Sequence, residues 1–183
     1  MPLFGLLRDR RDERVGFALY AAAVAAARDP FLYTTLGAPD TLDGRFDVLG
    51  LHAILLIRRL RAAPPPGPAL AQAVFDAMFA DMDLNLREMG VGDLSVGKRV
   101  KAMWEAFHGR ARAYESALDE NDDAALAAAI ARNVWRGAAP PAGSAMRFAR
   151  LAHAQQDALG EQPITALAAG TALFLPAASA AAE

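Results

Sequence analysis

One stretch of the chain has the glycine and lysine spacing of a phosphate-binding loop. From Gly92 the residues read GDLSVGK, the G-x-x-x-x-G-K frame in which backbone amides and a lysine hold phosphates. The next position of such a loop is Ser or Thr, whose hydroxyl binds Mg²⁺, and here it is Arg99. The residues before the glycines have a helical period, so the stretch is predicted to be a turn between helices. A nucleotide-binding enzyme is therefore the third of three functional hypotheses.

A second pattern, just before this turn, resembles part of a calcium-binding loop. Asp81, Asp83 and Asn85 have the 1-3-5 spacing of an EF-hand. Leu86 and Gly92 stand where that loop has its Gly and its bidentate Glu. The chain contains no cysteine, its three histidines are far apart in the sequence, and no Ser/His/Asp set is evident. The sequence thus predicts no enzyme, no metal site and no bound cofactor.

The composition is that of one folded domain. The chain has 183 residues, of which 54% are hydrophobic and 22% are charged, and its net charge is −2. A chain of this length buries a sizeable core. A net charge near zero supplies no general field that would attract DNA or anionic lipid. We expect a single domain over residues 1–183, with a flexible tail at 176–183.

The chain is predicted to be all-α. Apolar residues recur every three to four positions, and no segment alternates with period two over the length of a strand. Proline-rich linkers at 63–68 and 137–144 separate groups of helices. The predicted helices lie near 13–28, 43–62, 68–88, 94–119, 122–135, 144–160 and 163–172. We therefore expect a single compact domain of about six to seven helices.

The helices at 68–88 and 94–119 are predicted to form a central antiparallel hairpin, because both are amphipathic and a short glycine turn joins them. Gly90 stands where a helix end favours a left-handed residue. Asp93 or Ser95 is expected to cap the second helix.

The helix at 94–119 carries an apolar stripe on one side and charges on the other. The stripe consists of Val96, Val100, Met103, Trp104, Phe107, Ala111, Tyr114 and Leu118. Because Trp104 and Phe107 lie near its middle, both are expected to be buried core residues.

Charged side chains crowd the hairpin more densely than two packed helices need. The candidate partner-binding residues are Arg87, Asp93, Lys98, Arg99, Lys101 and Arg110. Arginine is favoured among them, because its planar fork binds carboxylates and carbonyls in a defined geometry. The structural alternative is that Arg87, Asp93 and Arg110 only stabilise the turn. The functional alternative is a ribosome- or RNA-associated adaptor that uses the basic side of the helix at 94–119.

The N-terminal residues partly resemble a signal peptide, because arginines at 8–14 precede an apolar run at 15–27. Acidic residues lie among the arginines, and the run is rich in Ala rather than Leu. Export is therefore not expected. No run reaches the ~18–20 apolar residues that a membrane span needs.

Three strings carry a resemblance to a known family: ARDPFLYTTLGAPDTLDGRFDVLGLH, DMDLNLREMGVGDLSVGKRVKAM and AFHGRARAY. They resemble the ubiquinol–cytochrome c chaperone family, the assembly factors for cytochrome b of the respiratory bc1 complex. The resemblance is best over residues 15–120 and looser in the C-terminal helices at 121–175. In the third string, His108 stands where the family usually has a tyrosine. The Ala-rich composition and compact length are typical of a bacterial, alphaproteobacterial member.

This resemblance implies an all-helical, non-enzymatic chaperone that binds newly made cytochrome b during its membrane insertion and haem acquisition. It implies a cytoplasmic protein that is peripheral to the inner membrane and lacks a transmembrane span. Mitochondrial relatives also act near the ribosomal exit tunnel with a small partner protein. The ribosome or the insertion machinery is therefore a further candidate partner. Plentiful apolar helix faces agree with a helper that shields a hydrophobic client segment.

Overall fold

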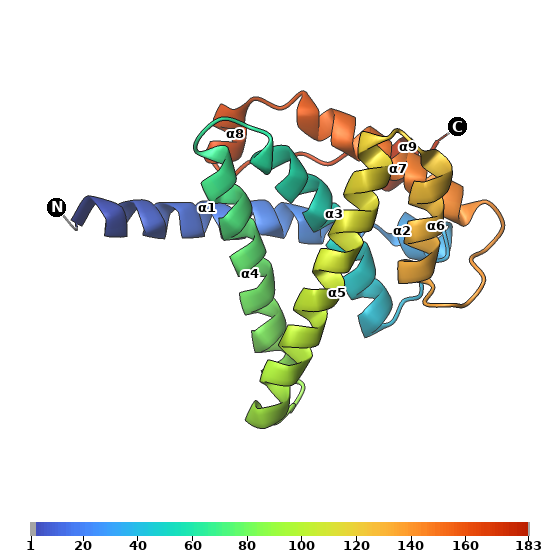
Figure 1. Cartoon of the computed structure of the whole chain (residues 1–183), viewed down its shortest axis with the longest axis horizontal. Coiled ribbons are helices and arrows are strands. Elements are labelled where there is room, and N and C mark those ends of the chain that lie inside the picture. The colour runs from blue at the N-terminus through green and yellow to red at the C-terminus, as the bar shows by residue number, and fades with distance from the viewer. Residues whose placement is uncertain (1–2, 183) are drawn as a thin grey trace.

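The structure, a computed structural model, describes residues 3–182, with side chains for residues 10–93 and 95–182. Within this part the chain folds into nine helices and no strand, as the all-α prediction requires (Figure 1). The helices are α1 (Leu3–Ala27), α2 (Pro30–Thr34), α3 (Leu42–Arg61), α4 (Gly67–Glu88), α5 (Asp93–Asp119), α6 (Asp123–Val134), α7 (Ser144–Gly160), α8 (Ile164–Ala168) and α9 (Ala177–Ala180).

The predicted helices differ from these mainly at the two ends of the chain. α1 begins ten residues before the predicted start at 13, because no proline interrupts the sequence between Leu3 and Ala27. α2 was not predicted. It begins at Pro30, where a fixed φ suits the first turn of a helix, and Asp29 Oδ1 accepts a hydrogen bond from Phe31 N at 3.0 Å.

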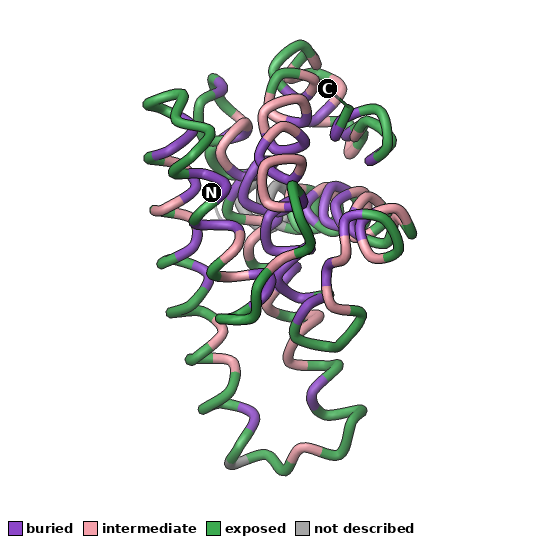
Figure 2. The backbone as a smooth tube through the Cα atoms, turned by 90° about the vertical axis from the view of Figure 1, so that its right-hand side faces the viewer, coloured by how far each residue is buried: buried purple, intermediate pink, exposed green. Residues whose placement is uncertain are grey.

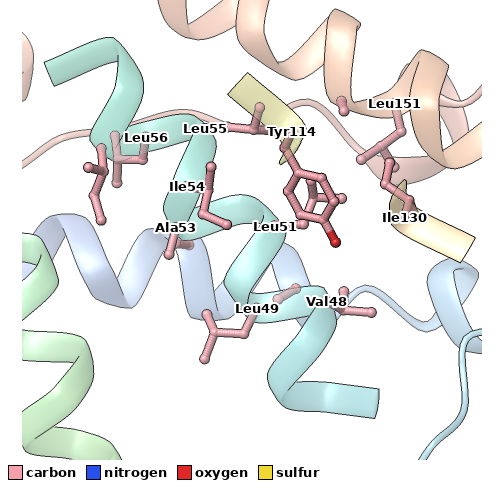
Figure 3. Close-up of a cluster of buried hydrophobic side chains, with 14 of the residues drawn as sticks. Val48, Leu49, Leu51, Ala53, Ile54, Leu55, Leu56, Tyr114, Ile130 and Leu151 are labelled. Carbon is pink, nitrogen blue, oxygen red and sulfur yellow. The ribbon is translucent and has the colours of Figure 1, made fainter. Parts of the chain in front are cut away.

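The core is built around α3, in which every residue from Phe46 to Ile57 is buried. α3 packs against α1, α4, α5 and α7. Figure 3 shows Tyr114 of α5 between α3 and the side chains of Ile130 and Leu151. The Tyr114 hydroxyl oxygen accepts a hydrogen bond from Asn133 Nδ2 at 3.1 Å, so this buried polar group has a partner.

α4 and α5 form the predicted antiparallel hairpin, and its turn projects from the body of the molecule (Figures 1 and 2). α4 ends at Glu88, and Gly90, just after the C-cap residue Met89, has a left-handed φ of +79°, as predicted. The Gly90 amide donates to Arg87 O at 2.9 Å, and the Val91 amide donates to Leu86 O at 3.1 Å. These two hydrogen bonds define a Schellman helix end. The glycine-rich stretch is therefore a helix–helix turn, preceded by a helix where a P-loop has a strand.

The start of α5 differs from the prediction. Gly92 is the N-cap residue, and no side chain caps the helix. Asp93 is the first helical residue, and its carboxylate binds Arg87 across the turn instead of a backbone amide. α3 follows the capping rule, because Thr41 Oγ1 accepts a hydrogen bond from Gly44 N at 3.1 Å.

Of the two aromatic residues expected in the core, one is buried and one is not. Phe107 is 3% exposed and packs with Phe75 and Phe79 of α4, at ring-centroid distances of 5.6 and 6.0 Å. Trp104 is 45% exposed, so the prediction that it is buried is wrong. It lies at the edge of the apolar stripe and packs on the ring of His108, with centroids 4.0 Å apart on the surface of α5.

Residues 176–182, part of the segment expected to be a flexible tail, contain α9 and contact the rest of the chain. Gln162 exchanges two hydrogen bonds with the backbone of Leu173, at 2.7 and 2.8 Å. The Ala177 amide donates to Asp29 Oδ2 at 3.0 Å, and α9 begins there. Buried alanines on α9 complete this packing. The sequence did not indicate it, because the segment is held by side chains far away in the chain.

Candidate partner-binding groove

The hairpin and the first half of α3 enclose an open groove of about 360 Å³. Most of its lining side chains are apolar: Leu42, Phe46, Met82, Leu86, Met89, Ala102, Met103 and Ala106. The polar lining residues are Asp43, Asn85, Arg99, Arg110 and Arg136. We call this set of residues the methionine groove. It is an apolar concavity with a few placed polar groups, which is the usual character of a binding site.

The groove continues along α4 into a second hollow of about 180 Å³. The two hollows share Leu42, Phe46, Met82 and Asn85, and the second one extends to Tyr20 of α1. The concavity thus follows one side of α4, between α5 on one flank and α1 and α3 on the other. A concave strip beside a helix suits an elongated partner segment better than a compact small molecule.

Three of the chain's six methionines line this groove, at positions 82, 89 and 103. Methionine is unbranched and polarizable, so a surface rich in it adapts to partners of different shape. Met89 is 51% exposed and Leu42 is 61% exposed, although both are large apolar residues. Exposed apolar side chains that line one concavity are typical of interaction surfaces.

Arg110 lies in the floor of the groove and belongs to a buried ion-pair network. Its Nη2 atom is 2.6 Å from Asp47 Oδ1, and Arg136 Nε is 2.7 Å from Asp47 Oδ2. Arg136 also binds Asp43 at 2.6 Å. Burial raises the pKa of Asp47, and the two arginines oppose that shift. The network links α5 and the end of α6 to α3. Arg110 therefore has a structural role beneath the groove.

Arg87 and Asp93 bind each other across the turn of the hairpin. Arg87 Nη1 lies 2.5 Å from Asp93 Oδ1, and Arg87 Nε lies 2.6 Å from Asp83. Both ion pairs are exposed, so each contributes little to global stability. This arrangement agrees with the structural alternative, in which the two residues stabilise the turn.

The remaining three candidates are exposed on α5, and they differ in their surroundings. Lys101 lies 3.8 Å from Glu105, and Lys98 is directed to solvent. Arg99 lines the methionine groove, and no carboxylate among the described side chains forms an ion pair with it. Arg99 is therefore the candidate that combines an unpaired charge with a place in the groove.

The groove residues Leu42, Phe46, Met82, Met89 and Met103 were not proposed as a site from the sequence. A signal was present in the clustering of methionines between positions 82 and 103. The periodicity alone does not tell which half of an apolar stripe faces the core, because that depends on where α3 stops covering the hairpin.

The other patterns in the sequence have structural explanations. Asp81, Asp83 and Asn85 all lie inside α4, so they do not form a calcium loop. Among the described side chains, no three potential metal ligands cluster together. None of the helices in residues 3–182 combines the length and apolar character that crossing a bilayer requires.

Comparison with known proteins gives two matches and one negative result. The family described as ubiquinol-cytochrome C chaperone matches residues 34–174. The crystal structure of the Cbp3 homolog from Brucella abortus is 37% identical in sequence and has a TM-score of 0.83, over 97% of this chain and 98% of that one. No curated protein sequence matches significantly.

Both matches extend over most of the chain and agree with its all-helical fold. The description of the family is that of a chaperone, which agrees with the expectation from the resemblance. The chain therefore belongs to the ubiquinol–cytochrome c chaperone family, and its role is that of a chaperone in bc1 complex assembly.

Proposed function

We propose that the protein binds newly made cytochrome b and that the methionine groove holds the client segment. The observation that carries this proposal is the exposed apolar lining of the groove, at the part of the hairpin where the family resemblance is densest. Cytochrome b exposes apolar helices before the complex is assembled. A chaperone must cover part of such a surface and release it later, and an open, adaptable groove suits that task.

The occupant is a helical segment with an apolar face and an acidic residue at its edge. The elongated shape of the groove matches an amphipathic helix, which lays its apolar face into such a concavity. Arg99 stands at the rim with no described carboxylate partner, so it is available to a carboxylate of the client. Lys98 and Lys101 contribute to the same positive rim from outside the groove.

The protein acts in the cytoplasm at the surface of the inner membrane, where cytochrome b is inserted. The ribosome-associated or RNA-binding adaptor remains the second candidate, using Lys98, Arg99, Lys101 and Arg112 of α5. Acidic residues interrupt that basic side, because Glu105 pairs with Lys101. The apolar groove therefore favours the client protein over nucleic acid.

Site-specific photocrosslinking in cells tests the proposal directly. A benzophenone amino acid at Met89 is expected to give an adduct with cytochrome b, because Met89 is exposed and lines the groove. The matched control is the same amino acid at Arg112, which is exposed on the same helix pair and outside the groove. Cytochrome b adducts from position 112 and none from position 89 would exclude the groove as the client site.

A charge reversal provides the functional arm of the test. Arg99→Glu is expected to leave the Tm nearly unchanged, since exposed charges contribute little to stability, and to lower the amount of assembled bc1 complex. Raised salt should weaken an RNA complex steeply but affect apolar client contacts little. Normal bc1 levels with folded Met82→Glu/Arg99→Glu protein would contradict the groove proposal.

A further inference from the structure

The outward side of α1 carries arginines, and the one exposed acid among the described residues of this helix, Glu13, lies at its edge. Positions three or four apart on this side are occupied by Arg10, Arg11, Arg14, Ala18, Ala21, Ala25 and Arg28, and all seven are exposed. The opposite side packs on the body of the protein, through Gly16, Leu19, Tyr20, Ala23 and Ala27. The helix therefore presents a mainly basic strip to solvent, with Glu13 beside it near the N-terminal end.

Of the two described acidic residues of α1, Asp12 is half-buried and Glu13 is exposed. They precede buried Gly16 by four and three positions, so they lie nearer to the packed side than the arginines do. Both line a hollow between α1 and α4. Of Arg10, Arg11 and Arg14, none forms an ion pair with a described carboxylate, in contrast to the paired arginines of the groove floor. Their charges are therefore available to an external anion.

The N-terminal region that contains α1 is net basic, whereas the rest of the chain is net acidic. Residues 1–28 contain five of the 19 basic residues and three of the 21 acidic residues. The remaining 155 positions are therefore net acidic, although the whole chain has a net charge of only −2. An anionic surface that attracts the protein will orient it with the outward side of α1 facing that surface.

The arginines at positions 10, 11 and 14 lie toward the free end of the helix. Phe17 is 43% exposed, but it lines the hollow between α1 and α4 together with Asp12 and Glu13. Figure 1 shows the N-terminal part of α1 extending beyond α4, clear of the other long helices. A helix side rich in exposed arginines is typical of segments that lie on the surface of an anionic bilayer.

We propose that the outward side of α1 docks the protein on an anionic membrane surface. The arginines of this strip, Arg10, Arg11, Arg14 and Arg28, bind lipid headgroup phosphates. Arg28 belongs both to this strip and to the second hollow that continues the methionine groove. Docking through α1 therefore places one end of the groove at the bilayer, where a client helix emerges. The inference specifies the membrane contact of the proposed function, but it does not depend on client binding.

Vesicle co-sedimentation with the purified full-length chain tests this inference. The probes are vesicles of phosphatidylcholine alone and vesicles containing about 30% phosphatidylglycerol or cardiolipin. The chain is expected to bind the anionic vesicles only, and less at raised salt, because each arginine near the surface contributes about 1 kcal/mol that is screened within a Debye length. Arg10→Glu/Arg11→Glu/Arg14→Glu should weaken this binding about tenfold or more.

The matched control reverses the same number of charges on α5, in Lys98→Glu/Arg99→Glu/Arg112→Glu. This variant should retain vesicle binding while it lowers bc1 assembly, so failure of the groove proposal and failure of the membrane proposal give different results. Circular dichroism and Tm establish that both variants are folded. Vesicle binding that the α1 variant retains, equal binding to neutral vesicles, or tighter binding of single-stranded RNA than of anionic vesicles at the same salt would overturn the inference.

Discussion

Arg110 and Asp47 form a buried ion pair, with Nη2 and Oδ1 2.6 Å apart, that joins α5 to α3 beneath the groove. Asp47 is fully buried and Arg110 is 8% exposed. Arg110 also lies over the ring of Phe46, with its guanidinium carbon 5.4 Å from the ring centroid. The pair therefore helps to hold the hairpin on the core, and Arg110 also forms part of the groove floor.

Arg110→Met is expected to lower the free energy of unfolding by about 3–5 kcal/mol, because it leaves Asp47 buried with a single partner, Arg136. Arg99→Met, an exposed position on the same helix, should change it by less than about 0.5 kcal/mol. Urea denaturation of both variants provides the measurement. Equal, small losses would place Arg110 among the surface charges instead.

Phe107→Ala and Trp104→Ala should differ strongly in stability, although the two residues are three positions apart. Phe107 is buried between α4 and α5, so its truncation should cost about 3–5 kcal/mol. Trp104 is half-exposed, and its truncation should cost about 1 kcal/mol or less. The comparison is made by urea denaturation. A Trp104 variant as unstable as the Phe107 variant would refute the surface placement of Trp104.

Gly90→Ala is expected to destabilise the protein by about 1 kcal/mol, because the φ of +79° is costly for any residue with a Cβ atom. Gly92→Ala, two residues away, is the control. Its φ is −63° and an added Cβ would meet no atom within 4 Å, so only the weaker N-cap preference of alanine should cost stability, by less than Gly90→Ala does. Thermal unfolding of the two variants distinguishes backbone strain from a general effect of substitution in the turn.

Gly16→Ala should destabilise the protein by about 1–3 kcal/mol, despite the higher helix propensity of alanine. A Cβ at Gly16 would lie 2.6 Å from backbone and side-chain carbons of Ala73, where α1 crosses α4. Gly109→Ala on α5 is the matched control, since its added Cβ meets open space. That substitution should stabilise the protein by about 0.5–1 kcal/mol. An increase in Tm for both variants would show that the crossing tolerates a methyl group.

The stability of the protein should fall as the pH decreases below about 6.5, in part through His52. Burial lowers the pKa of His52, against the opposing effects of its hydrogen bond to Val48 O and of Asp29. A group whose pKa is lower in the folded state stabilises the fold above its unfolded pKa and loses that contribution as the pH falls. His52→Leu should therefore show a weaker decrease in unfolding free energy between about pH 7 and pH 5. The same pH slope in both proteins would exclude His52 as a contributor.

The helical class, the positions of the six long helices and the Gly90 turn were predictable from the sequence, because each depends on local information. Apolar residues at helical spacing, proline-rich linkers and a glycine at a helix end all act within a few residues. The strings around residues 81–114 were also sufficient to indicate the family. The position of Phe107 in the core followed from its place in the middle of a stripe.

What the sequence did not determine is which apolar and charged residues remain exposed, and tertiary packing decided this. Their spacing in the sequence places Arg99 and Arg110 on the same side of α5. In the structure only Arg110 is buried, because it forms an ion pair with Asp47 of α3. Trp104 is exposed and Met89 and Met103 line a groove because α3 covers only part of the hairpin. The C-terminal segment is packed because Gln162 and Asp29 bind its backbone from elsewhere in the chain. Long-range contacts of this kind produce no periodic pattern in the sequence, so they are evident only in the folded chain.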